Sequence, residues 1–258
     1  ALMYELHGLS FREYLAFTGS LAYEPLDLKH LTEGSPSLRD SFPRDFRPLE
    51  HFHKYLSHGY YPFFRESEGG YHRRLRQLVR TMVEYDMAEL KGFDIRNAKK
   101  MLQLLSVISQ QVPFKPNISA LAQKSGIHRN SLNNYLHFLA EARLIGLLYP
   151  AGRRVAALQK PEKVYLDNPN LLYALGMGNA ERGTAREVFF YNQLRVRHRL
   201  AQSQQADFLV NDQLIFEMGG LNKTAQQIRG LPDAWVVQDD LAFPVGRALP
   251  LWLFGFLY

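Results

Sequence analysis

Residues 206–217 read Ala206-Asp207-Phe208-Leu209-Val210-Asn211-Asp212-Gln213-Leu214-Ile215-Phe216-Glu217, and this stretch decides the fold of the C-terminal part. It contains two short apolar segments joined by polar residues, which is typical of a β-hairpin. A two-residue loop would leave Asp207 and Glu217 on opposite faces. A three-residue loop gives one wholly apolar face and sets Asp207 directly across from Glu217. The sequence therefore favours the three-residue loop.

Two carboxylates facing each other on neighbouring strands repel unless a cation or a proton lies between them. Carboxylate oxygens are hard ligands of the kind that Mg²⁺ prefers. The pattern therefore predicts Asp207 and Glu217 as ligands of a divalent metal such as Mg²⁺, and no other cofactor is expected of these residues.

Length and composition limit the class of protein. A chain of 258 residues is long enough for two or three small domains. It contains no cysteine, which excludes disulfides and thiolate metal sites and is consistent with a cytoplasmic location. The longest apolar run, residues 249–258, is too short to span a bilayer, so no membrane partner is expected. A formal net charge of +6 allows a nucleic-acid partner.

Residues 1–95 are predicted to form a mostly helical, aromatic-rich region. Ser10-Phe11-Arg12-Glu13 is a capping box that opens a short helix. Further helices are expected at 49–57 and at about 71–90. His51 and His53 form an H-x-H pair, but residues two apart on a helix point to different sides, so we expect structural rather than metal-binding histidines.

Residues 96–180 carry the pattern of a winged helix. Two helices, the first capped by Ser119 and the second spanning about 129–142, are joined by a turn at Gly126, as in a helix-turn-helix. Apolar segments at 144–149 and 163–166 are predicted to be the strands of the wing.

The predicted second helix and wing are basic and amide-rich, which favours contact with duplex DNA. Arginine and asparagine can bind base edges, and wing arginines can bind phosphates. The competing interpretation is a connector between domains whose basic face is merely solvated. The candidate nucleic-acid-binding residues are Arg129, Asn130, Asn133, Asn134, His137, Arg153 and Arg154.

Residues 181–258 follow the order helix, hairpin, short helix at about 223–229, strand at 234–237 and buried closing segment at 249–258, an α/β order. Glu187, on the first helix, has two interpretations that need not exclude each other. It completes a capping box with Thr184, the favoured interpretation, or, as the resemblance of the hairpin to a nuclease fold described below implies, it is the first acid of the hairpin site.

Several motifs resemble a known bacterial family, the AAA-type ATPases that carry a C-terminal domain of unknown function. They are Leu9-Ser10-Phe11-Arg12-Glu13-Tyr14-Leu15, Gly59-Tyr60-Tyr61-Pro62-Phe63, Lys160-Pro161-Glu162-Lys163-Val164-Tyr165-Leu166, Gly183-Thr184-Ala185-Arg186-Glu187, Phe216-Glu217-Met218-Gly219-Gly220 and Pro250-Leu251-Trp252-Leu253-Phe254-Gly255. The resemblance implies an ATPase domain upstream, then a helical region, a winged helix and a PD-(D/E)xK endonuclease-like domain. No G-x-x-x-x-G-K-[ST] occurs in the sequence, so ATP is expected only for the longer parent chain, whose relatives form rings.

The hairpin resembles the PD-(D/E)xK core, in which a lysine stands two residues after the second acid. Here that position is Gly219, and the nearest lysine is Lys223. We therefore predict a domain that binds without cutting. The alternative is an active nuclease, in which Lys223 or Arg186 replaces the missing lysine.

Taken together, the sequence predicts an α+β multidomain chain: a helical region (1–95), a winged helix-turn-helix (96–180) and a small α/β restriction-endonuclease-like domain (181–258). The favoured function is a recognition or regulatory region of an AAA-type ATPase that binds DNA, the upstream ATPase domain or another partner. One alternative is a metal-dependent nuclease; another is a protein–protein adaptor. The candidate catalytic residues are Glu187, Asp207, Glu217 and Lys223.

Overall fold

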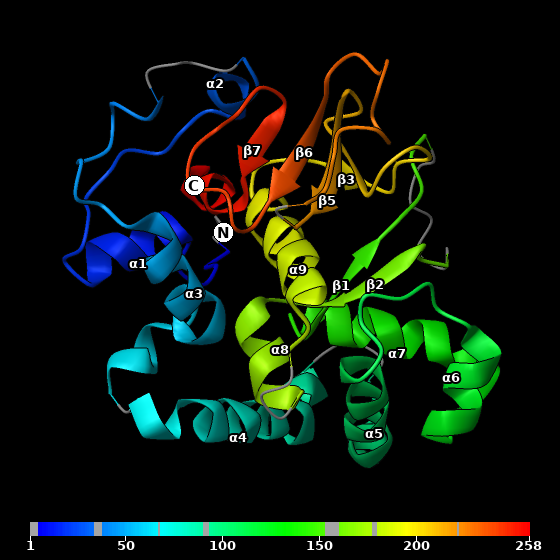
Figure 1. Cartoon of the computed structure of the whole chain (residues 1–258). Helices are drawn as coiled ribbons and strands as arrows, with labels where there is room; N and C mark the ends of the chain where they lie inside the picture. The colour runs from blue at the N-terminus through cyan, green and yellow to red at the C-terminus, as the bar shows by residue number, and fades with distance from the viewer. Residues whose placement is uncertain are drawn as a thin grey trace. The chain divides into compact units, whose positions relative to one another are not determined.

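The residues that the structure, a computed structural model, describes are 5–33, 38–66, 68–89, 93–152, 160–176, 180–220 and 222–258, with mixed α/β content. Figure 1 shows their helices and strands, coloured along the chain. By their internal packing these residues form two units. The first unit combines Ala1–Glu68 with Phe189–Tyr258, and the second is Gly69–Val188. The predicted domain boundaries lie at 95/96 and 180/181, whereas these units divide the chain at 68/69 and 188/189. The domain boundaries remain a prediction.

The first unit is built on a five-stranded mixed sheet with the strands in sequential order. Its outer hairpin pairs are antiparallel, and β5–β6 and β6–β7 are parallel. The strands are β3 (Leu200–Ala201), β4 (Phe208–Val210), β5 (Leu214–Gly219), β6 (Ala234–Gln238) and β7 (Ala248–Pro250). β5 therefore lies in the middle, between β4 and β6.

The β4–β5 hairpin has the predicted three-residue loop. Val210 pairs with Leu214 and Phe208 pairs with Phe216. The loop residues Asn211 and Asp212 have φ values of 52° and 59°, a left-handed conformation that asparagine and aspartate tolerate better than most residues. The phenylalanines of the pair are fully buried, so the predicted apolar face lies in the core.

Helices α1 (Phe11–Phe17), α2 (Leu28–Thr32) and α3 (Pro48–His58) also belong to the first unit, with the 3₁₀ segments η2 (Pro62–Arg65) and η6 (Leu251–Phe256). The capping box predicted at the start of α1 is present, with both reciprocal hydrogen bonds. Phe11 packs edge-to-face against Phe52 and Trp252, with ring centroids 5.3 and 6.5 Å apart. Aromatic side chains from distant parts of the sequence thus form one core.

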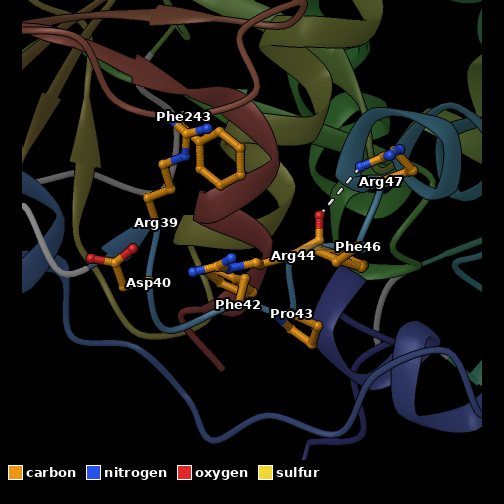
Figure 2. Close-up of a pocket in the computed structure, with 8 residues that line it drawn as sticks. All are labelled: Arg39, Asp40, Phe42, Pro43, Arg44, Phe46, Arg47 and Phe243. Carbon is orange, nitrogen blue, oxygen red and sulfur yellow. Dashed lines mark hydrogen bonds between the residues drawn. The ribbon is translucent and has the colours of Figure 1, made fainter.

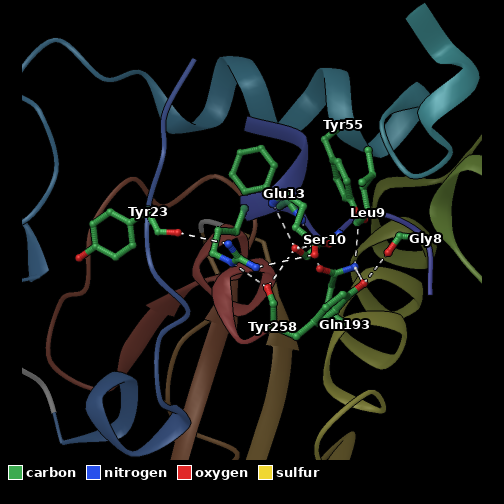
Figure 3. A network of polar contacts seen from close by, with 10 residues as sticks. Gly8, Leu9, Ser10, Glu13, Tyr23, Tyr55, Gln193 and Tyr258 are labelled. Carbon is green, nitrogen blue, oxygen red and sulfur yellow. Dashed lines mark hydrogen bonds and ion pairs between the residues drawn. The ribbon is translucent and has the colours of Figure 1, made fainter. Parts of the chain in front are cut away.

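A buried polar network joins the two segments of the first unit (Figure 3). Ser10 Oγ and Arg12 Nε donate hydrogen bonds to the main-chain oxygen of Tyr258, over 3.0 and 2.9 Å. Gln193 Nε2 donates to the Tyr55 hydroxyl (3.0 Å), which in turn donates to Leu9 O (2.6 Å). Burial raises the pKa of Tyr55 well above 10.0, so this hydroxyl remains a neutral donor.

The second unit contains a run of helices and a two-stranded antiparallel sheet. Its longer elements are α4 (Tyr71–Glu84), α5 (Ala98–Ser109), α6 (Ile118–Ser125), α7 (Arg129–Glu141), β1 (Ile145–Leu148), β2 (Lys163–Leu166) and α8 (Pro169–Leu175), with the 3₁₀ segments η3 (Glu68–Gly70), η4 (Asp86–Glu89) and η5 (Ile95–Asn97). Helix α9 (Arg182–Leu194) begins in this unit and ends in the first. Gly126, at φ 66°, ends α6 in the left-handed conformation that glycine adopts readily.

Two predicted element boundaries and one predicted helix are wrong. α4 ends at Glu84 rather than near residue 90, and a separate 3₁₀ turn follows it. α6 is capped by Asn117, whose carboxamide accepts a hydrogen bond from Ala120 N, because asparagine competes well with serine for this role. Residues 225–230 form turns instead of the expected helix.

Within the described ranges no helix has the length and apolar character to cross a bilayer.

Candidate functional site

The two hairpin acids lie together, as the register predicts. Asp207 directly precedes β4, so continuing the Phe208–Phe216 pairing sets it across from Glu217 on β5. Asp207 Oδ2 accepts a hydrogen bond from Met218 N over 2.9 Å, which ties the carboxylate to β5. The Glu217 side chain is only 6% exposed, whereas Asp207 is half-buried. The favoured register is confirmed.

A lysine stands beside this acid pair although the expected position holds glycine. Lys223 Nζ lies 2.6 Å from Glu217 Oε1 and 3.1 Å from Gln227 Oε1. Gln227 Nε2 donates to the other carboxylate oxygen of Glu217 over 3.1 Å. Both oxygens of Glu217 therefore have partners from the segment that follows β5. The sequence did not predict a role for Gln227 at this site. Its position four residues after Lys223 is the one feature of the sequence that suggests a contact between the two side chains.

The chain after β5 folds back over the position where the motif lysine would stand. A Cβ atom added to Gly219 would lie 2.2 Å from the Cβ of Lys223, so only glycine leaves room for this side chain. Gln238 Nε2 holds the turn by donating to Gly220 O and Lys223 O, over 3.2 and 3.0 Å. Ile228 is buried against Ala206, Ala234 and Val236, which anchors the far end of the segment. Lys223 thus reaches Glu217 from a turn rather than from the strand.

The charges at the site act on Glu217 in opposite directions. Burial raises the pKa of Glu217 above its ordinary value of 4.5. The hydrogen bond from Lys223 lowers it, and the negative charge of Asp207 raises it again. The net rise means that the single ammonium group does not fully offset burial and the second carboxylate.

Asp207 and Glu217 are the residues of this site whose oxygens are of the kind that bind Mg²⁺. Mg²⁺ is usually held in proteins by one or two carboxylates, and water and substrate phosphates complete its shell. Asp207 and Glu217 are such a pair of carboxylates, and both oxygens of Glu217 already have partners within the chain. Among the described residues no group of three or more His, Asp or Glu side chains is placed to hold a metal ion.

The other predicted acid, Glu187, is held within the second unit. Its Oε2 accepts hydrogen bonds from Lys163 Nζ and the Tyr165 hydroxyl, each over 3.0 Å. The predicted capping box is wrong: α9 begins at Arg182, so Thr184 lies inside the helix and donates its hydroxyl to Val112 O. Arg186, the predicted substitute for the motif lysine, is half-buried on α9 in the same unit.

The candidate DNA-binding residues of α7 differ in exposure. Arg129, Asn130 and Asn134 are exposed, and His137 is half-buried. Asn133 is also half-buried, and its Oδ1 atom is shielded from solvent with no hydrogen-bond partner in the described part of the chain. Arg153 and Arg154 lie outside the described residues. On α7, the exposed candidates are therefore Arg129, Asn130 and Asn134.

The two histidines of α3 have different partners. The His51 ring stacks on Phe46 with centroids 5.7 Å apart, and burial lowers its pKa. His53 Nε2 lies 3.8 Å from an Asp240 carboxylate oxygen. The side chains point to different surroundings, as their spacing on a helix predicts.

Comparison with known proteins places this chain in a family. Residues 49–182 match a family described as a domain of unknown function (DUF8612), and the chain belongs to it. The chain is also similar to the uncharacterized protein MJ1637 of Methanocaldococcus jannaschii, with 23% identity over 168 residues. That match covers 64% of this chain and 36% of the archaeal protein, so the chain spans about a third of that relative's length. No solved structure matches the chain.

Neither comparison names an activity. The family match ends at residue 182, before the β4–β5 hairpin, so the acid pair and Lys223 lie outside it. What these residues do must be argued from their own chemistry.

Proposed function

We propose that this chain is a nucleic-acid-processing region of a larger AAA-type ATPase, and that its hairpin site hydrolyses phosphodiester bonds with the help of Mg²⁺. The observation that carries the proposal is the 2.6 Å contact between Lys223 Nζ and Glu217 Oε1. The sequence alone argued against cleavage because position 219 holds no lysine. The contact removes that objection, since an ammonium group stands beside the acid pair.

Each residue of the site has a distinct role in this proposal. Asp207 and Glu217 would hold the metal, which when bound stabilises negative charge on the phosphate and lowers the pKa of a water. Lys223 has three N–H donors, of which Glu217 and Gln227 take two. The third, at a side chain that is 33% exposed, can donate to a phosphate oxygen that gains charge during cleavage.

The winged-helix interpretation of the second unit supports a nucleic-acid substrate. Helices α6 and α7 are joined by a short turn and followed by the antiparallel pair β1–β2, the element order of a winged helix. Arg129, Asn130 and Asn134 on α7 would bind the duplex, and Arg153 and Arg154 would bind phosphates. The ATPase part of the proposal rests on the motif resemblance.

A second candidate function is recognition without cleavage. Both oxygens of the buried Glu217 are already paired within the chain, to Lys223 and to Gln227. In this case Lys223 takes the place of a metal ion as the cation beside Glu217, and the domain binds without cutting.

Incubating the protein with supercoiled plasmid and Mg²⁺ or Mn²⁺ distinguishes these functions. We expect metal-dependent cleavage that falls roughly 100-fold or more in Asp207→Asn, Glu217→Gln and Lys223→Met, the range observed when a charge-stabilising group is removed. Lys54→Met, an exposed lysine of α3 in the same unit, is the matched control and should cleave normally.

Duplex binding is measured in parallel, with circular dichroism as the check of folding. Binding at low salt without cleavage in either metal would exclude the nuclease function and favour recognition without cleavage. Neither binding nor cleavage would favour a protein–protein adaptor.

A further inference from the structure

A basic cavity of about 780 Å³ lies in the first unit, beside the segment that leads into α3 (Figure 2). Three arginines from a stretch of nine residues line it: Arg39, Arg44 and Arg47. Among the described lining residues, Asp40 is the one carboxylate. None of these described residues belongs to the Asp207–Glu217–Lys223 site.

The three guanidinium groups are not neutralised by the described part of the chain. None of them forms an ion pair there, and all three side chains are exposed. Arg47 Nη1 donates a hydrogen bond to Arg44 O over 3.4 Å. Since like charges gathered at one cavity repel, an anion bound among them would relieve this repulsion.

Aromatic rings form the apolar part of the wall. Phe42 and Phe46 are buried and stack with centroids 5.8 Å apart, which fixes the base of the cavity. Phe243 is half-buried, and the Arg39 guanidinium lies 5.2 Å from its ring centroid. Figure 2 shows this guanidinium beside the Phe243 ring. A guanidinium stacked on a ring keeps its in-plane N–H groups available for an anion.

We propose that this cavity binds the terminal phosphate of a nucleotide, either a free nucleoside phosphate or the phosphorylated end of a nucleic-acid strand. The three guanidinium groups carry more N–H donors than the two oxygens of a single carboxylate can accept. A terminal phosphate has three oxygens and up to two negative charges, so it matches these donors better. The volume is within the range of small-ligand sites, and the aromatic wall suits the flat base.

Fluorescence anisotropy with a labelled single-stranded decamer tests the proposal. The decamer carries either a 5′-phosphate or a 5′-hydroxyl, and EDTA is present so that the acid site holds no metal. We expect the phosphorylated decamer to bind roughly tenfold more tightly, about the contribution of one charge-assisted hydrogen bond. The variant Arg39→Ala/Arg44→Ala should lose this difference, and Arg44→Lys should keep part of it.

The matched control is Arg73→Ala, an exposed arginine of α4 in the other unit, which should bind like the unaltered protein. Because EDTA removes the metal that the acid site would need, failure of the proposed nuclease function is distinguished from failure of this one. Adenosine diphosphate and pyrophosphate are then added as competitors. Displacement by them identifies free nucleoside phosphates as ligands, and displacement by phosphorylated strands alone identifies a strand end.

Equal binding of the two decamers, with no competition by either small phosphate, would overturn the proposal. So would an Arg39→Ala/Arg44→Ala variant that binds as tightly as Arg73→Ala. The chain contains no P-loop motif, so nucleotide binding has no competing explanation from that source.

Discussion

Glu217 makes the acid site sensitive to pH. Burial raises its pKa above the ordinary 4.5, so the folded protein binds this proton more tightly than the unfolded chain does. As pH rises from 4.5 through the raised folded-state value, the free energy of unfolding should therefore fall. Glu217→Gln, which cannot titrate, should show a flatter dependence over the same window. Urea denaturation at a series of pH values, followed by tryptophan fluorescence, measures this difference.

The control for this prediction is Glu141→Gln, an exposed glutamate of α7, whose pH dependence should follow that of the unaltered protein. Parallel curves for the protein and Glu217→Gln would contradict it. Both tryptophans, Trp235 and Trp252, lie in the unit that contains Glu217, so their fluorescence reports on the relevant fold.

At the scale of elements, the hairpin register could be predicted because side chains alternate strictly along a strand. Only one loop length buried both Phe208 and Phe216, so the apolar pattern was sufficient. The position of Lys223 could not be predicted in this way. It depends on a turn held by Gln238, a residue from a later strand, and no local pattern encodes such a contact. For the same reason the expected helix at 223–229 is absent.

Gly219 should tolerate no side chain because the Lys223 side chain occupies the position that a Cβ atom would take. A Cβ atom there would lie 2.2 Å from Lys223 Cβ and 2.3 Å from its Cγ, so Gly219→Ala must displace the lysine. We expect a loss of about 1–3 kcal/mol in the free energy of unfolding, the usual range for overpacking. Urea denaturation followed by circular dichroism measures it.

Gly183→Ala is the matched control, because no atom lies within 4 Å of the added Cβ and alanine favours a helix. It should be neutral or slightly stabilising. Equal stability of Gly219→Ala and the unaltered protein would mean that Lys223 is not held over this position.

At the scale of the molecule, the sequence does not reveal that the two ends of the chain share one core. Helix α1 and the closing segment η6 each look locally complete, yet Phe11 packs against Trp252 and Phe256. Aromatic residues on a helix face predict burial but not the partner, which here lies some 240 residues away. The winged-helix and endonuclease-like assignments stay predictions, whereas most helix and strand positions followed from periodicity and capping.

A substitution at Gln193 tests this shared core, because the Gln193 carboxamide forms hydrogen bonds with residues near both ends of the chain. Its Oε1 accepts from Phe11 N over 3.4 Å, and its Nε2 donates to the Tyr55 hydroxyl, all in buried surroundings. Gln193→Ala leaves these groups without that partner, and each buried group so affected costs about 1–3 kcal/mol. We expect a lower urea midpoint by tryptophan fluorescence, while Gln123→Ala, an exposed glutamine of α6, should change nothing. Equal midpoints for the two variants would show that the hydrogen bonds of Gln193 do not stabilise the first unit.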